Sequence, residues 1–310
     1  MPEVHIPPRL IETLAQWPTP EGAEWQRELP ARLARLIERW ELTLGPPYLP
    51  GGATSYVAPA RRADGTLAVL KVVIPHREAR DEADALRVWA GNGAVVLLDS
   101  MREEHALLLE HCDPGTALGD LTDHDAILDA GADVLSQLWD ADAPAEPFEP
   151  LEAVTDWFAE LVTERQARLG RPLPQPLVDE AVEALRELPR SADRRVVLHH
   201  DFHPGNVLAA TRAPWLAIDP KPQVGDPAFD PLQLIIQTGD PLATPDPAAT
   251  IRSRLLRVSE RLGVDPERVR AWGVGRCVEW SLSRAADDGP EAGADDEHPS
   301  AFEQALSHGR

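Results

Sequence analysis

The sequence is poor in lysine and in cysteine. Lys71 and Lys221 are its only lysines, and every other residue among its 30 Lys and Arg is an arginine. The two cysteines, Cys112 and Cys277, are too few for a disulfide scaffold and lack the spacing of a metal site. The cysteine content therefore favours a reducing compartment, and we expect a cytoplasmic protein.

Long apolar runs are also missing. No stretch approaches the roughly 18 uninterrupted apolar residues that a membrane helix needs. The first ten residues hold no basic region followed by an apolar run, so they do not resemble a signal peptide. The sequence also lacks the G-x-x-x-x-G-K-S/T motif of Walker-type nucleotidases. We expect neither a membrane span nor a Walker-type phosphate loop.

Positive charge is in deficit. The chain carries 52 acidic residues against 30 basic ones, a net charge of −22. Nucleic acids and anionic membranes bind mainly through Lys and Arg, so both are poor partners for this chain. A cationic small molecule is a better match, because an acidic field raises its local concentration. The acidity can also serve solubility alone, and we expect a monomer or a weak dimer.

The remaining composition is that of a folded protein. Its 310 residues are 43% hydrophobic and 26% charged, which is ordinary for globular chains and argues against intrinsic disorder. The length allows two domains, or one large domain of two lobes, with ample core.

The first third of the chain reads as a mixture of helices and strands. A Gly-Pro-Pro stop follows the first helical segment, an Asp-Gly turn joins a β-hairpin, and a Gly-Asn-Gly sequence ends the next helix. We predict helix at 9–44, strands at 54–60 and 66–74, helix at 77–90, and strands at 94–98 and 106–109.

The rest of the chain is mainly helical, with a few strands inserted midway. A break at Asp113-Pro114-Gly115 separates the two parts, so we predict an α+β protein with a strand-rich lobe at 1–112 and a helical lobe at 113–310. We predict helices at 123–139, 151–169, 176–188 and 228–285 with a break at 240–247, strands at 195–198, 207–210 and 215–218, a solvated acidic loop at 287–297, and a short helix at 300–307.

The most informative segment is His199–Asn206, which lies between two hydrophobic β runs and must form a loop. Its His-x-Asp-x-x-x-x-Asn spacing is that of a kinase catalytic loop. Phosphoryl transfer needs a carboxylate beside the attacking hydroxyl, and Asp201 fits that role. It also needs oxygen ligands for a metal ion, which Asn206 and Asp219 can supply, because Asp219 ends the following apolar run.

This segment resembles the aminoglycoside phosphotransferase family, whose loop reads roughly H-G-D-x-H-x-x-N and whose later carboxylate sits in I-D-P. Further stretches resemble the group of streptomycin 6-kinases and hydroxyurea phosphotransferases, and the resemblance covers nearly the whole chain. It implies a two-lobed, protein-kinase-like fold. The A-P-E sequence of protein kinases is absent. The matching residues are His199, Asp201, His203, Asn206, Ile218-Asp219-Pro220, Gly51–Ser55, Glu82–Leu86 and Gly225–Asp230.

By this resemblance a strand lysine should hold the nucleotide phosphates and pair with a helix glutamate. Lys71 lies late in the second hairpin strand, and Glu82 follows on the next helix, with Glu78 as the rival partner. Lys221 can reach a phosphate or pair with a neighbouring carboxylate.

The other nucleotide contacts are implied in the same way. A glycine-rich turn lets backbone N–H groups approach phosphates, which points to Gly52 and Ser55. The lobe junction of related kinases binds adenine through its main chain, which points to His111 and Asp113.

The resemblance therefore implies a magnesium- and ATP-dependent phosphotransferase with a small hydroxylated acceptor, and a possible role in antibiotic resistance. The acceptor can be an aminoglycoside of the streptomycin type, hydroxyurea, or a metabolic hydroxy compound. Asp226, Glu279 and Trp280 are the residues we predict to bind it.

Two other readings remain. The histidines of the catalytic-loop segment can instead be ligands of a zinc hydrolase, although that leaves Lys71, Asn206 and Asp219 without a role. The protein can also be a kinase-like binding module that transfers nothing.

Overall fold

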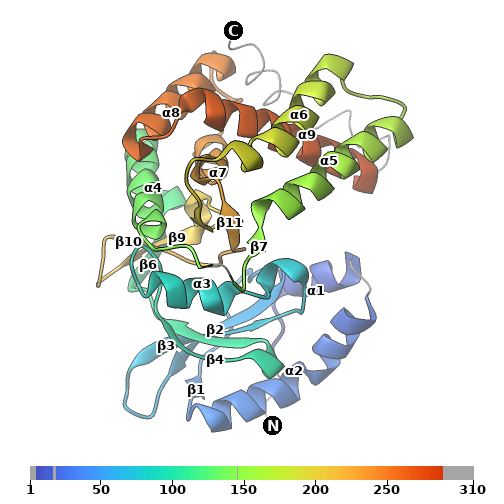
Figure 1. Cartoon of the computed structure of the whole chain (residues 1–310). Coiled ribbons are helices and arrows are strands. Elements are labelled where there is room, and N and C mark those ends of the chain that lie inside the picture. Colours follow the sequence, from blue (N-terminus) through green and yellow to red (C-terminus); the bar gives the residue numbers. More distant parts are fainter. Residues whose placement is uncertain (1–4, 17–18, 145, 289–310) are drawn as a thin grey trace.

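The computed structural model describes residues 5–16, 19–144 and 146–288, and it has two lobes. The smaller lobe is built on one antiparallel sheet with the strand order β1-β2-β3-β5-β4. Figure 1 shows helices on both sides of this sheet and a larger, mainly helical lobe above it. The strands are β1 (Thr43–Leu44), β2 (Ser55–Arg61), β3 (Leu67–Val73), β4 (Leu97–Met101) and β5 (Ala106–Glu110).

The central strands are apolar on both faces because each face is covered. Successive side chains of a strand point to opposite sides, so β3 divides into two sets. Leu70 and Val72 belong to the buried cluster that includes Trp25 and Leu29 of α2 (Pro20–Arg39). Lys71 therefore points to the opposite face, where α3 (Glu82–Trp89) packs.

The N-terminal helical segment is two helices rather than the single one predicted at 9–44. The first is α1 (Pro8–Gln16), and α2 begins after Thr19, whose hydroxyl accepts the Gly22 N–H. Proline at the first position suits a helix start, which explains why a new helix begins at Pro20. The helix ends at Arg39, and residues 43–44 instead form β1 against β2.

The larger lobe consists of helices around two small three-stranded sheets, with strand orders β10-β9-β6 and β7-β11-β8. Its long helices share one hydrophobic core with α3 of the smaller lobe. The helices are α4 (His124–Trp139), α5 (Leu151–Arg168), α6 (Gln175–Glu187), α7 (Pro231–Ile236), α8 (Pro247–Leu262) and α9 (Pro266–Asp288), and the strands are β6 (Pro114–Ala117), β7 (Glu149–Pro150), β8 (Val196–Leu198), β9 (Val207–Ala210), β10 (Trp215–Ala217) and β11 (Gln223–Gly225).

One predicted strand is displaced. We expected a strand at 94–98, but β4 covers Leu97–Met101. Ala94 instead forms an isolated bridge with Ala217 of β10, and the Val95 N–H donates to the Ala217 carbonyl at 3.1 Å. The apolar residues at 94–95 are thus buried because they tie the small lobe to the large one.

The other differences are small. The predicted helix at 77–90 begins with a 3₁₀ turn, Arg77–Ala79, and becomes α-helical at Glu82. The short strands β6, β7 and β11 were not predicted, because two to four residues carry no readable alternation. The predicted loop at 287–297 lies mostly outside the described residues, and the predicted helix at 300–307 lies wholly outside them. None of the described helices is long and apolar enough to cross a membrane.

Candidate active site

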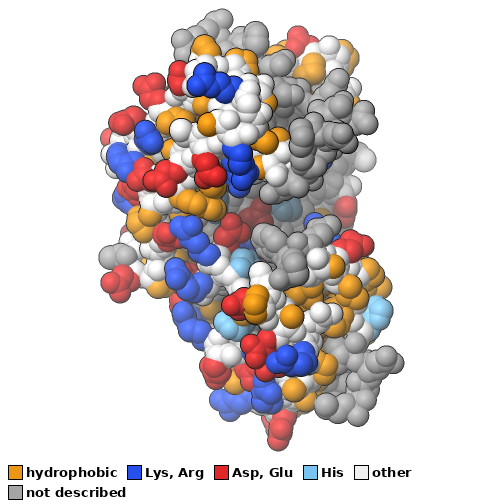
Figure 2. Space-filling model, turned by 90° about the vertical axis from the view of Figure 1, so that its right-hand side faces the viewer, with side chains coloured by type: hydrophobic (Ala, Val, Ile, Leu, Met, Phe, Trp, Pro, Cys, Tyr) orange, Lys and Arg blue, Asp and Glu red, His pale blue; other side chains and the backbone are white. Residues whose placement is uncertain are grey.

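The predicted catalytic loop connects β8 to β9 in the large lobe, beside the junction of the lobes. Figure 2 shows the surface hollowed at mid-height, with acidic, basic and histidine side chains set back in the recess. The buried carboxylate of Asp230 holds the backbone of the loop in place. It accepts hydrogen bonds from the N–H groups of His199 at 2.9 Å and His200 at 2.8 Å. His200 adopts a left-handed conformation, φ +65°, which costs energy and needs such support.

Asp230 is a positioning residue that sequence reasoning missed. It ends the Gly225–Asp230 segment, which resembles the family and in which only Asp226 was given a role. Burial raises the pKa of its carboxyl to about 6, although the two backbone N–H groups and the Trp139 indole oppose the rise.

Asn206 closes the loop onto Asp201. Its side-chain Nδ2 donates to the Asp201 backbone carbonyl at 3.0 Å and lies 3.5 Å from the Asp201 carboxylate. Because the amide nitrogen is used inside the loop, the amide oxygen is left to face a ligand.

Asp219 reaches the same place from the end of β10. The Ile218 N–H donates to the Asn206 carbonyl at 2.9 Å, which holds the two segments side by side. Asp219 itself has φ +58°, and this turn brings its carboxylate toward the small lobe. The structure therefore brings Asp201, Asn206 and Asp219 together, as the spacing predicted.

Lys71 lies at the centre of the charged cluster. Its ammonium contacts both oxygens of Glu82 at 2.7 Å and Oδ1 of Asp219 at 2.5 Å. Burial of Lys71 opposes its charge, but Asp219 and Glu82 outweigh burial and raise the pKa of the lysine above its ordinary value. Burial also raises the pKa of Glu82. The partner of Lys71 is thus Glu82, and Glu78 lies on the preceding 3₁₀ turn.

Lys221, whose role the sequence left open, contacts the same carboxylate. Its Nζ lies 2.8 Å from Oδ1 of Asp219. Burial opposes ionisation of Asp219, but the two lysines together hold its pKa well below the usual range. The two lysines balance the two carboxylates, Glu82 and Asp219, so this cluster adds no net negative charge at the place where an anionic nucleotide would arrive.

The glycine-rich turn lies just before β2. A side chain on Gly52 would approach the Ser55 hydroxyl to 2.9 Å, and Gly51, at φ +92°, packs against Pro7. The turn therefore needs its glycines to fold back on itself, and it places Gly52 next to Ser55. At the lobe junction, the Asp113 carbonyl accepts the Thr211 hydroxyl at 2.9 Å, so it is engaged within the protein, and His111 begins the link to β6.

The three predicted acceptor residues are engaged elsewhere. Asp226 is buried, and its Oδ2 accepts from Arg268 at 2.6 Å and from the Trp272 indole at 2.7 Å. Glu279 is also buried and accepts from Arg276 at 3.2 Å and from Ser283 at 2.6 Å, and the Arg276 guanidinium lies over the Trp280 ring. Their surroundings are those of structural residues.

Arg276 is a buried cation that the sequence did not single out. Its guanidinium lies 4.2 Å from the centre of the Phe158 ring and 4.8 Å from that of Trp280. Burial lowers its pKa, and its nearby charge helps burial to lower the pKa of His200.

The histidines of the loop are used as hydrogen-bonding groups. The Nε2 of His199 bonds to the Ile218 carbonyl at 2.9 Å, and the Nδ1 of His203 accepts the Gly205 N–H at 3.1 Å. Among the described residues, no group of three or more His, Cys, Asp or Glu side chains is arranged to hold a metal ion. The zinc-hydrolase reading therefore gains no support from the structure.

A pH prediction arises at His199. Its ring is fully buried, and its Nδ1 has no hydrogen-bond partner among the described residues, so protonation would bury an unpaired N–H. Burial lowers the pKa of His199 from 6.5 to about 4. In the unfolded chain this histidine is protonated below about pH 6.5, whereas in the folded chain it stays neutral down to about pH 4. The unfolding free energy therefore decreases as the pH is lowered from 6.5 to 4.

The expected loss from this one group is about 3 kcal/mol of unfolding free energy between pH 6.5 and 4. Urea unfolding at a series of pH values should show a shallower acid dependence in His199→Asn than in the unmodified protein. An identical slope in the two proteins would show that His199 does not carry the effect.

Comparison with known proteins identifies relatives of this chain in sequence and in fold. A streptomycin 6-kinase from Streptomyces glaucescens is 37% identical over 280 residues, which is 90% of each chain. A hydroxyurea phosphotransferase from Kitasatospora aureofaciens is also 37% identical, over 92% of this chain and 81% of the other. Among solved structures, the aminoglycoside phosphotransferase APH(4)-Ia matches with a TM-score of 0.60 at 18% identity, covering 91% of this chain and 99% of the other.

A choline kinase from Streptococcus pneumoniae has the same fold, with a TM-score of 0.59 at 16% identity over 90% of this chain and 98% of the other. The predicted protein-kinase-like α+β fold is thus confirmed. The sequence model of the aminoglycoside/hydroxyurea antibiotic resistance kinases matches residues 39–289. The chain therefore belongs to the aminoglycoside/hydroxyurea antibiotic resistance kinase family, and it is a phosphotransferase that acts on a hydroxyl group.

Proposed function

We propose that this protein uses ATP to phosphorylate a hydroxyl group of a streptomycin-type aminoglycoside. The observation that carries the proposal is the cluster in which Lys71 contacts Glu82 and Asp219 beside the Asp201 loop. This cluster belongs to a chain that is 37% identical to a streptomycin 6-kinase.

In the proposed reaction, Asp201 orients the acceptor hydroxyl and accepts its proton. The hydroxyl oxygen bonds to the γ-phosphorus, the bond from that phosphorus to the β,γ-bridging oxygen breaks, and ADP leaves. Lys71, held by Glu82, binds phosphate oxygens, so that catalysis comes mainly from positioning and charge neutralisation.

The residues present fit a magnesium ion. Mg²⁺ prefers oxygen ligands and is usually held by one or two protein groups together with substrate phosphates. The Asn206 amide oxygen and the Asp219 carboxylate form such a pair, and both lysines lie on Oδ1 of Asp219, which leaves Oδ2 toward a cation. When bound, the ion would neutralise phosphate charge.

We also propose that the nucleotide lies between the glycine-rich turn and the lobe junction. The N–H groups at Gly52 and Ser55 would face phosphate oxygens. The main chain of His111 to Asp113 would face adenine, and the Asp113 carbonyl, which already accepts the Thr211 hydroxyl, keeps a second lone pair for this contact.

The acceptor surface needs different residues from those the sequence suggested, because Asp226 and Glu279 are paired internally. A cavity of about 200 Å³ beside Lys221 is lined by the half-exposed Trp157 of α5 and by Glu149. Arg77 pairs with the Glu149 carboxylate and lies over the Trp157 ring, so a cationic acceptor would have to take the place of its guanidinium. An aromatic face and a carboxylate are suited to a cationic sugar.

Hydroxyurea is the second candidate acceptor, because a hydroxyurea phosphotransferase is as similar to this chain as the streptomycin 6-kinase. A direct test incubates the purified protein with MgATP and either streptomycin or hydroxyurea, and follows ADP release and the gain of a phosphoryl group by mass spectrometry.

We expect streptomycin to be phosphorylated and hydroxyurea to react more slowly. Asp201→Asn protein prepared in parallel is the control for contaminating kinases, because it keeps the fold but lacks the proposed base. Phosphorylation of hydroxyurea alone would replace the main proposal by the second, and reaction of neither compound would contradict both.

A further inference from the structure

A second and larger cavity adjoins the 200 Å³ cavity beside Lys221 and shares His76, Arg77 and Arg80 with it. It has a volume of about 800 Å³, is open to solvent on one side, and is bordered by the end of β3, the 3₁₀ turn before α3, α3 itself, β4 and the start of β5. Its apolar wall includes Val73 and Leu107 of the sheet and Ala83 of α3. None of Lys71, Asp201, Asn206 and Asp219 lines it.

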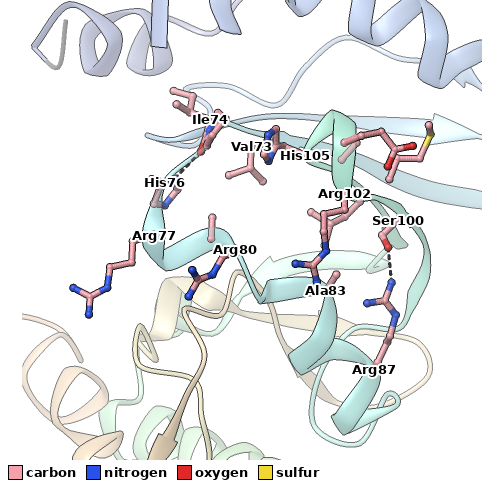
Figure 3. Close-up of a pocket in the computed structure, with 16 residues that line it drawn as sticks. Val73, Ile74, His76, Arg77, Arg80, Ala83, Arg87, Ser100, Arg102 and His105 are labelled. Carbon is pink, nitrogen blue, oxygen red and sulfur yellow. Dashed lines mark hydrogen bonds between the residues drawn. The ribbon is translucent and has the colours of Figure 1, made fainter. Parts of the chain in front are cut away.

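The rim of this cavity is cationic. Figure 3 shows Arg80, Arg87 and Arg102 around the cavity, with Arg77 directed away to one side. Glu103 is the one carboxylate among its lining residues. A concentration of arginines around an apolar wall is unusual for a chain whose net charge is −22.

The arginines keep unused hydrogen-bonding capacity. Arg87 and Arg102 share one carboxylate, that of Asp84, at 2.7 and 2.6 Å, and Arg87 also donates to the Ser100 hydroxyl at 2.5 Å. Arg80 makes a single long contact of 3.5 Å with Asp81, and its side chain is 59% exposed. Because Asp81 and Asp84 do not line the cavity, the face that a ligand would meet is dominated by guanidinium groups.

We propose that this cavity binds a small organic anion that joins an apolar body to a carboxylate, sulfonate or phosphate group. The apolar wall would bury the body, and the guanidinium groups of Arg80, Arg87 and Arg102 would bind the anionic head, since arginine matches such oxygens with paired N–H donors. The volume is within the ordinary range for small-molecule sites.

Binding of a ligand in the cavity should affect the active site, because α3 contributes residues to both. Ala83 and Arg87 line the cavity, while Glu82 of the same helix holds Lys71. A ligand that moves α3 would shift the Lys71–Glu82 pair and with it the affinity for nucleotide, and by linkage the nucleotide would shift the ligand equally. This coupling, unlike the binding itself, rests on the proposed function.

The test uses anilinonaphthalene sulfonate, a fluorescent dye that combines an apolar body with one anionic group. Its binding to the full chain is titrated by fluorescence for the unmodified protein and for Arg80→Gln and Arg102→Gln. We expect each substitution to weaken binding about tenfold, as loss of one charged hydrogen bond does. Arg62→Gln is the matched control, because Arg62 is a half-exposed arginine of the same lobe with one long contact, to Asp64 at 3.7 Å.

The site is supported if Arg62→Gln binds the dye normally while the other two variants bind it weakly. It is overturned if all four proteins bind alike, or if saturating MgATP displaces the dye completely, because the dye then occupies the nucleotide site. For the coupling, MgADP affinity measured by calorimetry should change by about fivefold or more in saturating dye. No change overturns the coupling alone, and failure of phosphoryl transfer leaves the dye-binding result intact.

Discussion

Asp201→Asn should lower the rate of phosphoryl transfer by about 10² to 10⁴, because an amide cannot accept the proton that the acceptor hydroxyl loses. The shape of the loop should survive the change. Asn206 bonds to the backbone carbonyl of residue 201 at 3.0 Å, and Asp230 holds the loop through the backbone N–H groups of His199 and His200. Neither contact depends on the Asp201 carboxylate, so the affinity for nucleotide and the stability should stay close to normal.

The measurement is kcat for the acceptor identified by the screen, together with the affinity for MgADP by calorimetry. Asp133→Asn serves as the matched control, because Asp133 is a half-exposed carboxylate paired with Arg261 on the large lobe. Near-normal turnover in Asp201→Asn would remove Asp201 from the mechanism. A parallel loss in both variants would show that the effect is not specific to the loop.

The parts of the site that the sequence predicted are those fixed by local chain geometry. Asp201 and Asn206 lie in one loop between two strands. Asp219 follows β10, which pairs with β9, the strand that leaves this loop, so spacing places the three residues together. Lys71 was predicted from the family resemblance, and alternation along β3 explains why its side chain points away from the apolar Leu70 and Val72. Glu82 against Glu78 was left open, since both lie close to the start of the same helix.

The acceptor-binding residues could not be predicted, because whether a carboxylate is free to bind a ligand depends on residues that are distant in the sequence. Asp226 looked available in the sequence, but Arg268 and Trp272, more than forty residues later, neutralise it in the core. Glu279 likewise lies 3.5 Å from Arg165 of α5, far earlier in the chain, and it also pairs with Arg276 of its own helix, whose guanidinium packs on aromatic rings. An acidic residue's availability is set by packing between helices, and a helical pattern alone does not say which carboxylates a neighbouring arginine will reach.

The same dependence on packing explains the cavity beside α3. Arg80, Arg87 and Arg102 come from two segments that the sequence treated as an ordinary helix and a strand boundary. Only the antiparallel pairing of β4 with β5 brings Arg102 next to α3. The spacing of residues in the sequence does not predict charge clusters that separate elements form in this way.

Lys71→Met should both inactivate the enzyme and destabilise it. Activity should fall by about 10² to 10³, the usual loss when a positioned charge that stabilises the transition state is removed. The unfolding free energy should fall by about 3–5 kcal/mol, because Glu82, only 1% exposed, is left as a buried charge without its cation. Asp219 should contribute less to this loss, since Lys221 still contacts it and its side chain is 35% exposed.

The double variant Lys71→Met/Glu82→Leu separates the two effects. Replacing a buried ion pair by apolar residues of similar size is often neutral for stability, so the double variant should recover most of the lost unfolding free energy in urea. It should recover none of the activity, because the phosphate-binding ammonium is still missing. Arg261→Met is the matched control, since its partner Asp133 stays solvated and surface pairs contribute only about 0–1 kcal/mol. If the double variant regained activity, Lys71 would serve only to hold α3 in place. If Lys71→Met were as stable as Arg261→Met, the buried Lys71–Glu82 pair would not restrain α3. The proposed coupling between the arginine-rimmed cavity and the active site requires that restraint.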